Sequence, residues 1–319
     1  MLSLQSCFKE EMMIPPHEQG DLEEGQAALG PYYESQVYFD LYDNEEVSTS
    51  SIYAYDLSFE SSGEGWIVRL NSAQFMLAGN SNDTLFSAEL IMDDLEMTFD
   101  KSDGNPDSTA IGKWYGVAED SIWSHRNVYL VDRGSDKEGN SLGQMKVQFG
   151  MSGDDYLMRY ANTGNSGDTL VRIVRDQAMD QVYYSFDNGI VNIAPQADQW
   201  SLLFSKYTTM LVTDEGEDYP YLVVGILLNP KGVAAARDTI HDFMDMNADD
   251  VSDLVFTTQA DVIGYDWKYY DFDAGVYTIV PDMNYVIRDR DGFFYKFRFV
   301  DFYSDQGAKG YPTFEFVRL

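Results

Sequence analysis

The side chains of this chain that are best suited to bind a metal gather within six consecutive positions. His241 brings an imidazole, and Met244 and Met246 bring two thioethers. The other two histidines, His17 and His125, are far away in the sequence, so the three histidines do not by themselves define a metal site. An isolated histidine followed by methionines is also typical of a surface loop anchored by apolar side chains.

Signatures of known enzyme classes are absent from the sequence. It has no nucleophile elbow, no glycine-rich phosphate loop before a helix, no His-Glu-x-x-His and no cysteine pair for zinc. With 54 acidic residues, carboxylate pairs are expected by chance, so a hydrolase that uses such a pair is only a third alternative with no residues to assign. Residues 100–107 offer oxygen ligands but lack the glutamate that would complete a calcium loop. The sequence therefore predicts a protein that is not an enzyme.

The balance of charge argues against one class of partner. Lysine and arginine number 21 against 54 acids, for a net charge of −33. A field of this sign repels phosphate backbones and anionic lipid surfaces, so we expect no nucleic-acid binding. No stretch approaches the ~20 apolar residues that a spanning helix requires.

The single cysteine, Cys7, has a sequence context typical of lipidation. Residues 4–6, Leu-Gln-Ser, resemble a bacterial lipobox, in which a small residue precedes the lipidated cysteine. Residues 1–4 would then be the end of an apolar signal segment that begins upstream. Residues 8–11, Phe-Lys-Glu-Glu, resemble the signature of surface-exported lipoproteins of Bacteroidetes. We expect residues 1–30 to hold a truncated signal, the lipobox and an acidic tether, with membrane attachment through the lipid alone.

The elements that must position these side chains have the patterns of strands. In the last 35 residues, Asp291-Gly292 supplies a tight turn between strands at 285–287 and 293–302, and residues 311–319 form a third strand. Alternation along the second strand predicts a buried face and a solvent face. The buried face carries Tyr295, Phe297 and Phe299, and the solvent face carries Lys296 and Arg298.

Three strand segments occur twice in the chain. The first two recur at an offset of 145, and the third follows a longer loop in its second copy. The pairs are 36–39 with 181–184, 55–59 with 200–204, and 66–71 with 225–229. This self-similarity predicts two related units, about 31–175 and 176–319, within one β domain over 31–319, or alternatively two separate domains.

Short strands at intervals of about ten residues favour an all-β sandwich or barrel-like fold. Helix is expected only as a turn or two near 232–237 and 249–254.

The closing hairpin resembles that of the HmuY-like haem-binding lipoproteins of Bacteroidetes. The resemblance is carried by residues 285–299 and 310–316, and by the segments 36–39, 55–59, 69–71 and 263–267. It implies an all-β fold that holds a planar porphyrin and is displayed on, or shed from, the outer membrane. It also implies delivery of haem for iron acquisition to an outer-membrane receptor.

Haem-binding members of this family hold the iron with two axial histidines or methionines, one upstream of the tryptophan strand and one just beyond it. The upstream position falls on His241, Met244 and Met246. The downstream stretch, 267–275, has neither histidine nor methionine, so a tyrosinate from Tyr270 or its neighbour Tyr269 is the candidate replacement. We therefore expect a haem-binding surface lipoprotein. The alternative is a surface lipoprotein of the same fold that binds a glycan, a peptide or a receptor partner.

Overall fold

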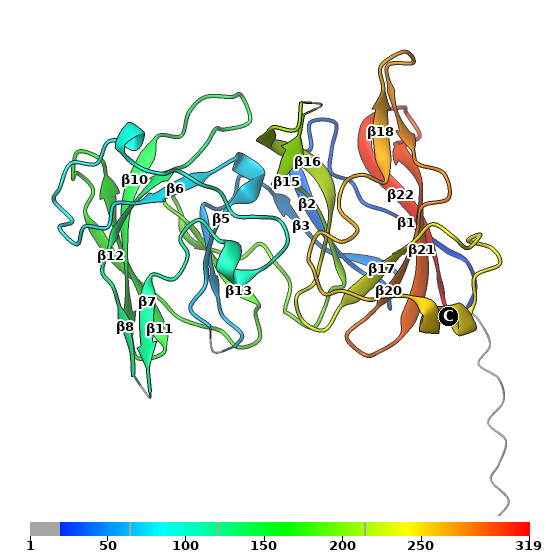
Figure 1. The fold of residues 1–319 in the computed structure, drawn as a ribbon, viewed down its shortest axis with the longest axis horizontal. Coiled ribbons are helices and arrows are strands. Elements are labelled where there is room, and N and C mark those ends of the chain that lie inside the picture. The colour runs from blue at the N-terminus through cyan, green and yellow to red at the C-terminus, as the bar shows by residue number, and fades with distance from the viewer. Residues whose placement is uncertain (1–19, 64, 120, 214) are drawn as a thin grey trace, which may run out of the picture.

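The computed structural model describes residues 20–63, 65–119, 121–213 and 215–319. Cys7 and the expected lipid anchor lie outside these residues. The described chain forms two lobes side by side (Figure 1). Each lobe packs a five-stranded antiparallel sheet against a four-stranded one and carries a two-stranded hairpin. The predicted all-β fold class with little helix is confirmed.

Lobe 1 is built from strands in the middle of the chain. Its sheets have the orders β12-β11-β10-β9-β6 and β14-β13-β4-β5. Their alternate side chains meet in one core, where Trp114, Phe149 and Tyr156 are among the largest members, and burial of this apolar surface drives the packing. The bounds are β4 Leu57–Glu60, β5 Val68–Leu70, β6 Leu77–Asn80, β9 Val128–Asp132, β10 Gln144–Ser152, β11 Asp155–Asn162, β12 Thr169–Ile173, β13 Gln181–Ser185 and β14 Gly189–Val191, with hairpin β7 Tyr115–Ala118 and β8 Ser121–Ser124.

Lobe 2 combines the two ends of the described chain. Its sheets have the orders β1-β22-β21-β20-β17 and β16-β15-β2-β3. In its core the Trp267 ring stacks on Phe299 with centroids 3.7 Å apart. The bounds are β1 Glu23–Gln26, β2 Ser35–Asp40, β3 Glu45–Ser51, β15 Leu202–Val212, β16 Asp218–Leu228, β17 Ala234–Asp238, β20 Asn284–Arg288, β21 Phe294–Tyr303 and β22 Lys309–Arg318, with hairpin β18 Lys268–Asp271 and β19 Val276–Ile279.

Helix is limited to short 3-10 turns in the described residues. They are η1 Ser72–Gln74, η2 Met92–Asp94, η3 Pro106–Ser108 and η4 Ala248–Asp253. The helical turn predicted near 249–254 is confirmed, but the one predicted near 232–237 is wrong. Residues there form β17, because the free edge of β20 offers a complete set of backbone partners that outweighs the helix propensity of three alanines. None of the described helices is long and apolar enough to cross a membrane.

The predicted terminal hairpin is confirmed. Gly292, with φ of 89°, closes the turn between β20 and β21, and the predicted aromatic face is buried. The expectation that Lys296 faces water is wrong, because this side chain is only 3% exposed. Met246 and its neighbours cover this face of the sheet, and the Lys296 ammonium donates to the carbonyl of Met246 at 2.9 Å.

The folded region begins earlier than the predicted tether boundary at residue 30. Residues 23–26 form β1, which pairs with β22, and Ala27 and Leu29 are fully buried. The sequence pattern hides this strand because its inward position is a glycine. A Cβ atom on Gly25 would lie 2.5 Å from the Phe314 ring, so the glycine makes room for that ring in the core.

The repeated segments occupy equivalent places in the two lobes. Leu57 pairs with Tyr184 in lobe 1, and Leu202 pairs with Phe39 in lobe 2. Leu202 follows Leu57 by 145 residues, and Tyr184 follows Phe39 by the same 145 residues. The strands that hold the first repeated segment are exchanged between the lobes, however. β2, from the start of the chain, pairs with β15 in lobe 2, and β13 pairs with β4 in lobe 1. The matched register supports the hypothesis of two related units, and their division near residue 175 stays a prediction.

Two buried asparagines repeat the same local structure. The Asn71 amide donates to the carbonyls of Ile52 and Tyr55 at 2.7 and 2.8 Å. The Asn229 amide donates to the carbonyls of residues 197 and 200, again offset by 145, at 2.9 and 2.7 Å. Each asparagine fixes the loop that leads into the central strand of its smaller sheet.

Candidate functional site

An open groove of about 380 Å³ lies on lobe 2. It is lined by Asp242 and Phe243, from the loop after β17, and by residues 279–284, which run from the end of β19 to the start of β20. Residues 298–300 of β21 also line it. The groove therefore joins the loop that carries His241 to the segment beyond the Trp267 hairpin.

The imidazole of His241 lies between two carboxylates. Its Nδ1 is 2.7 Å from Oδ2 of Asp238, and its Nε2 is 3.8 Å from Oδ1 of Asp250. The hydrogen bond with Asp238 raises the pKa of His241, and the charges of Asp238 and Asp250 raise it further. In the neutral ring, a histidine whose Nδ1–H donates to a carboxylate presents Nε2 as its available nitrogen, which is the usual arrangement of metal-binding histidines, whereas the raised pKa favours the charged ring with a proton on Nε2.

Asp238 holds this loop as well as the ring. It ends β17, and its buried carboxylate accepts the backbone N–H of Ile240 at 2.8 Å. Burial acts to raise the pKa of Asp238, but the hydrogen bonds from Ile240 and His241 outweigh it and leave the pKa lowered. The Asn284 amide donates to the carbonyl of His241 at 2.9 Å, which ties the loop to the start of β20.

The two predicted methionine ligands have different surroundings. Met244 is 63% exposed, whereas Met246 is 1% exposed and packs with Val286 and Leu319. The carbonyls of both methionines accept the ammonium of Lys296. Of the two thioethers, only that of Met244 is accessible to a ligand from outside.

Tyr270 lies on a different element from His241. It is on β18, and its ring contacts Phe272 and Tyr277 of the same hairpin, each with centroids 5.1 Å apart. Tyr269 and Tyr270 are about half exposed. Within the described part of the chain, no hydrogen bond, ion pair or ring contact joins Tyr270 to His241.

The groove also contains Met283, a residue that the sequence patterns do not indicate as a ligand. Met283 lines the groove, and its Sδ accepts the Tyr285 hydroxyl at 3.1 Å. The sequence feature that could have indicated Met283 is its position directly before the first strand of the terminal hairpin. The groove also carries Arg298, which lies over Phe243 and donates to Glu315 at 2.8 Å. In the described residues, no group of three or more His, Cys, Asp or Glu side chains is placed to hold a bare metal ion.

The fold is an all-β scaffold of two lobes with an open groove on lobe 2. Residues 177–316 match the profile of the family described as HmuY protein. The HmuY resemblance inferred from the sequence is thus confirmed over the segment that carries the groove and the terminal hairpin. No curated protein matches the chain.

Several solved structures are similar to this chain at low identity. Apo PinO from Porphyromonas gingivitis has 9% identity, with 93% of this chain and 96% of that chain covered and a TM-score of 0.30. The apo HmuY analog TFO from Tannerella forsythia has 9% identity, with 95% and 97% covered and a TM-score of 0.26. A protein from Bacteroides vulgatus described as a HmuY_like heme binding protein has 14% identity, with 43% and 77% covered and a TM-score of 0.19. Likenesses this distant do not assign a function.

Proposed function

We propose that this protein binds haem at the groove on lobe 2, with Nε2 of His241, which precedes the lining residues Asp242 and Phe243, as one axial ligand. The observation that carries the proposal is the His241–Asp238 pair, because the carboxylate holds Nδ1 and orients the ring, so that Nε2 is the nitrogen left to bind iron in place of its 3.8 Å contact with Asp250. The match to the HmuY family profile over residues 177–316 also supports haem as the ligand. A porphyrin supplies four equatorial nitrogens, so the protein needs to add only axial ligands.

The second axial ligand comes from another segment that lines the groove in this proposal. Met283 lines the groove together with Asp242 and Phe243 of the His241 loop, and a thioether is an established axial ligand of haem iron. Its Sδ would bind iron in place of the hydrogen bond that it accepts from the Tyr285 hydroxyl. Met244 is the alternative, since it is exposed on the same loop as His241. Burial of Met246 and the separate hairpin of Tyr270 make these two residues weaker candidates. Arg298 beside the groove provides a cation for a haem carboxylate.

In the same proposal, the protein is a lipoprotein anchored through Cys7 at the outer-membrane surface, where it passes haem to a receptor for iron acquisition. Labelling cells with a radioactive fatty acid tests the anchor: the wild type is expected to incorporate label, and Cys7→Ser is not. Protease treatment of intact cells tests surface display.

Titration of haem into the purified protein tests the ligand. We expect a sharpened Soret band that is lost in His241→Ala and retained in His125→Ala, a matched change at an exposed histidine. Met283→Leu removes a thioether with little change in size, and Met244→Leu is its comparator. An unchanged Soret band in His241→Ala would exclude the proposed ligand.

A binder of a different, smaller ligand is the second candidate function. The observation that favours it is a separate cleft between the two lobes, which has both charged and apolar walls. A broad and unsaturable absorbance change on haem addition would favour this alternative.

A further inference from the structure

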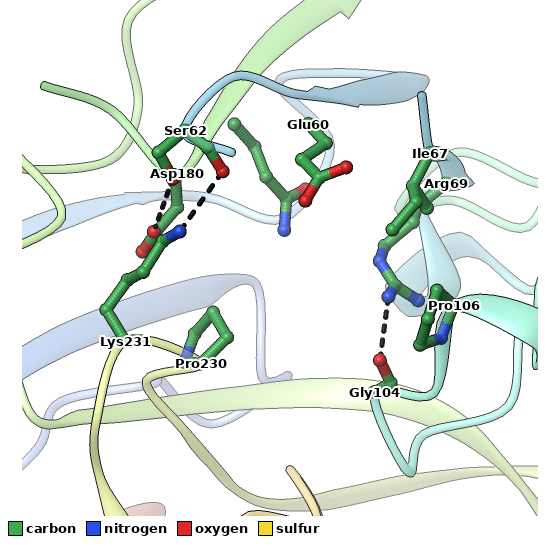
Figure 2. Close-up of a pocket in the computed structure, with 10 residues that line it drawn as sticks. Glu60, Ser62, Ile67, Arg69, Gly104, Pro106, Asp180, Pro230 and Lys231 are labelled. Atoms are coloured by element: carbon green, nitrogen blue, oxygen red, sulfur yellow. Dashed lines mark hydrogen bonds between the residues drawn. The ribbon is translucent and has the colours of Figure 1, made fainter. Parts of the chain in front are cut away.

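A cleft lies where the two lobes meet. It consists of two hollows of about 250 and 180 Å³, which share residues of their lining and are therefore contiguous. At the inner hollow the hydroxyls of Tyr38 and Tyr183, which are equivalent positions in lobe 2 and lobe 1, are 3.2 Å apart. Figure 2 shows the outer hollow. The combined space is of the size that small ligands occupy.

The two walls of the cleft have different chemistry at equivalent positions. Ser58 and Arg69 are cross-strand partners on lobe 1, and their counterparts on lobe 2 are Leu203 and Leu227. Side chains two residues apart in a strand share a face, so Glu60 lies on the same face as Ser58. At these equivalent positions lobe 1 thus presents polar and charged groups and lobe 2 presents two leucines, while Lys231 adds a cation from lobe 2 to the outer hollow. A ligand suited to this cleft has a charged end and an apolar body.

Two carboxylates in the cleft have oxygens without a partner. Oε2 of Glu60 and Oδ2 of Asp180 are buried and accept no hydrogen bond from any described residue. The other oxygen of Asp180 accepts the Ser62 hydroxyl at 3.2 Å, and the Lys231 ammonium donates to the carbonyl of Ser62 at 3.1 Å (Figure 2). Buried acceptors without a donor cost free energy, which an ammonium group on a ligand would recover once the two carboxylates turn toward it.

The guanidinium of Arg69 faces these carboxylates across the outer hollow (Figure 2). Its Nη2 donates to the carbonyl of Gly104 at 2.8 Å, and the described residues provide no other hydrogen bond to the group. A guanidinium with N–H groups to spare is a natural partner for a carboxylate.

We propose that the interlobe cleft binds a zwitterionic α-amino acid with a large aliphatic side chain. Its ammonium lies at Glu60 and Asp180, its carboxylate lies at Arg69, and its side chain packs against Leu203 and Leu227. This site is separate from the haem groove, so either proposal can fail without the other.

Calorimetric titration of the full chain with L-leucine tests the inference. We expect saturable binding to the wild type and at least tenfold weaker binding of 4-methylpentanoate, which lacks the ammonium, and of leucinamide, which lacks the carboxylate. Glu60→Gln and Arg69→Met should weaken L-leucine binding by a similar factor. Asp154→Asn, at an exposed carboxylate outside the cleft, is the matched control and should bind as the wild type does.

Two results would overturn the inference. One is the absence of saturable heat with L-leucine at millimolar concentration. The other is equal affinity of the wild type for L-leucine, 4-methylpentanoate and leucinamide, which needs no variant and does not depend on any variant folding. Thermal unfolding of Glu60→Gln and Arg69→Met, compared with the wild type, shows whether a loss of binding comes from a loss of folding.

Discussion

At the residue scale, one carboxylate controls the ring proposed to bind iron. Asp238 accepts a hydrogen bond from Nδ1 of His241 and also accepts the backbone N–H of Ile240, so it sets both the loop and the ring orientation. Ile240 and His241 lie only two and three positions after Asp238. The geometry is therefore encoded locally, in the end of β17 and the turn after it.

Asp238→Asn should weaken haem binding by about 10- to 100-fold, the usual cost of losing a carboxylate behind a metal-binding histidine. The amide cannot hold the Nδ1–H of His241 as strongly as the carboxylate does. Haem titration followed at the Soret band measures the change, with Asp154→Asn as the control. An affinity within twofold of the wild type would show that Asp238 does not position the ligand.

A second residue-scale feature is a lysine buried at the base of the β18–β19 hairpin. Burial lowers the pKa of Lys268 to about 7. Its ammonium donates to the carbonyl of Val224 at 2.7 Å and lies 4.1 Å from the centre of the Trp267 ring. The folded protein therefore releases this proton at a lower pH than the unfolded chain does.

The Lys268 side chain should make the protein more stable as pH rises from about 7 to 9.5. In this window the unfolded lysine is protonated and the folded one is not, so the unfolded state binds more protons and the free energy of unfolding increases. The slope contributed is at most ~1.4 kcal/mol per pH unit. Urea unfolding at several pH values should show this rise in the wild type relative to Lys268→Met. Parallel pH profiles for the two proteins would contradict the prediction.

At the element scale, the strands could be predicted where their signals are local. The terminal meander has strict alternation and an Asp-Gly turn, so its three strands follow from neighbouring residues alone. Strand β1 could not be found in this way, because Gly25 gives no apolar signal and the strand exists only through its pairing with β22. The burial of Lys296 was equally hidden, since it depends on a loop 50 residues away.

In the candidate site, too, some residues can be found from local sequence signals and others only from the fold. A run of suitable side chains identifies His241 and Met244, whereas Met283 lines a groove with Asp242 and Phe243 of their loop only because of the tertiary fold. Tyr270 was selected by its distance along the chain from Trp267. The fold places its ring against others in its own hairpin, a contact that sequence distance does not reveal.

The repeated asparagines allow the two smaller sheets to be compared directly. Asn71→Ala and Asn229→Ala each leave two buried loop carbonyls without a donor. Both should therefore lower the free energy of unfolding, by ~2–4 kcal/mol each. Chemical denaturation measures this, with Asn188→Ala as an exposed control. A large effect at one position and none at the other would show that the two sites are not energetically equivalent.

At the scale of the whole molecule, the strand exchange decides which parts of the chain depend on each other. All the buried residues of the lobe 1 core lie between residues 57 and 184, in one continuous segment. The lobe 2 core combines residues 202–316 with five residues from the start of the described chain, which are Ala27, Leu29, Val37, Phe39 and Leu41. The segment that matches the HmuY profile therefore lacks part of its own core.

This difference predicts how fragments behave. Residues 53–199 should fold alone, with cooperative thermal unfolding and a structured near-ultraviolet circular dichroism spectrum, because they contain both sheets of lobe 1. Residues 200–319 should not fold alone, since they lack β1 and β2 and would expose the core face that those strands cover. Adding residues 20–52 after residue 319 of the 200–319 fragment, through a short glycine linker, should restore cooperative unfolding. A short linker suffices because the two ends to be joined are adjacent: the backbone N–H of Gly20 donates to the carbonyl of Arg318 at 2.8 Å. Cooperative folding of residues 200–319 without this addition would show that the exchanged strands are not needed to complete lobe 2.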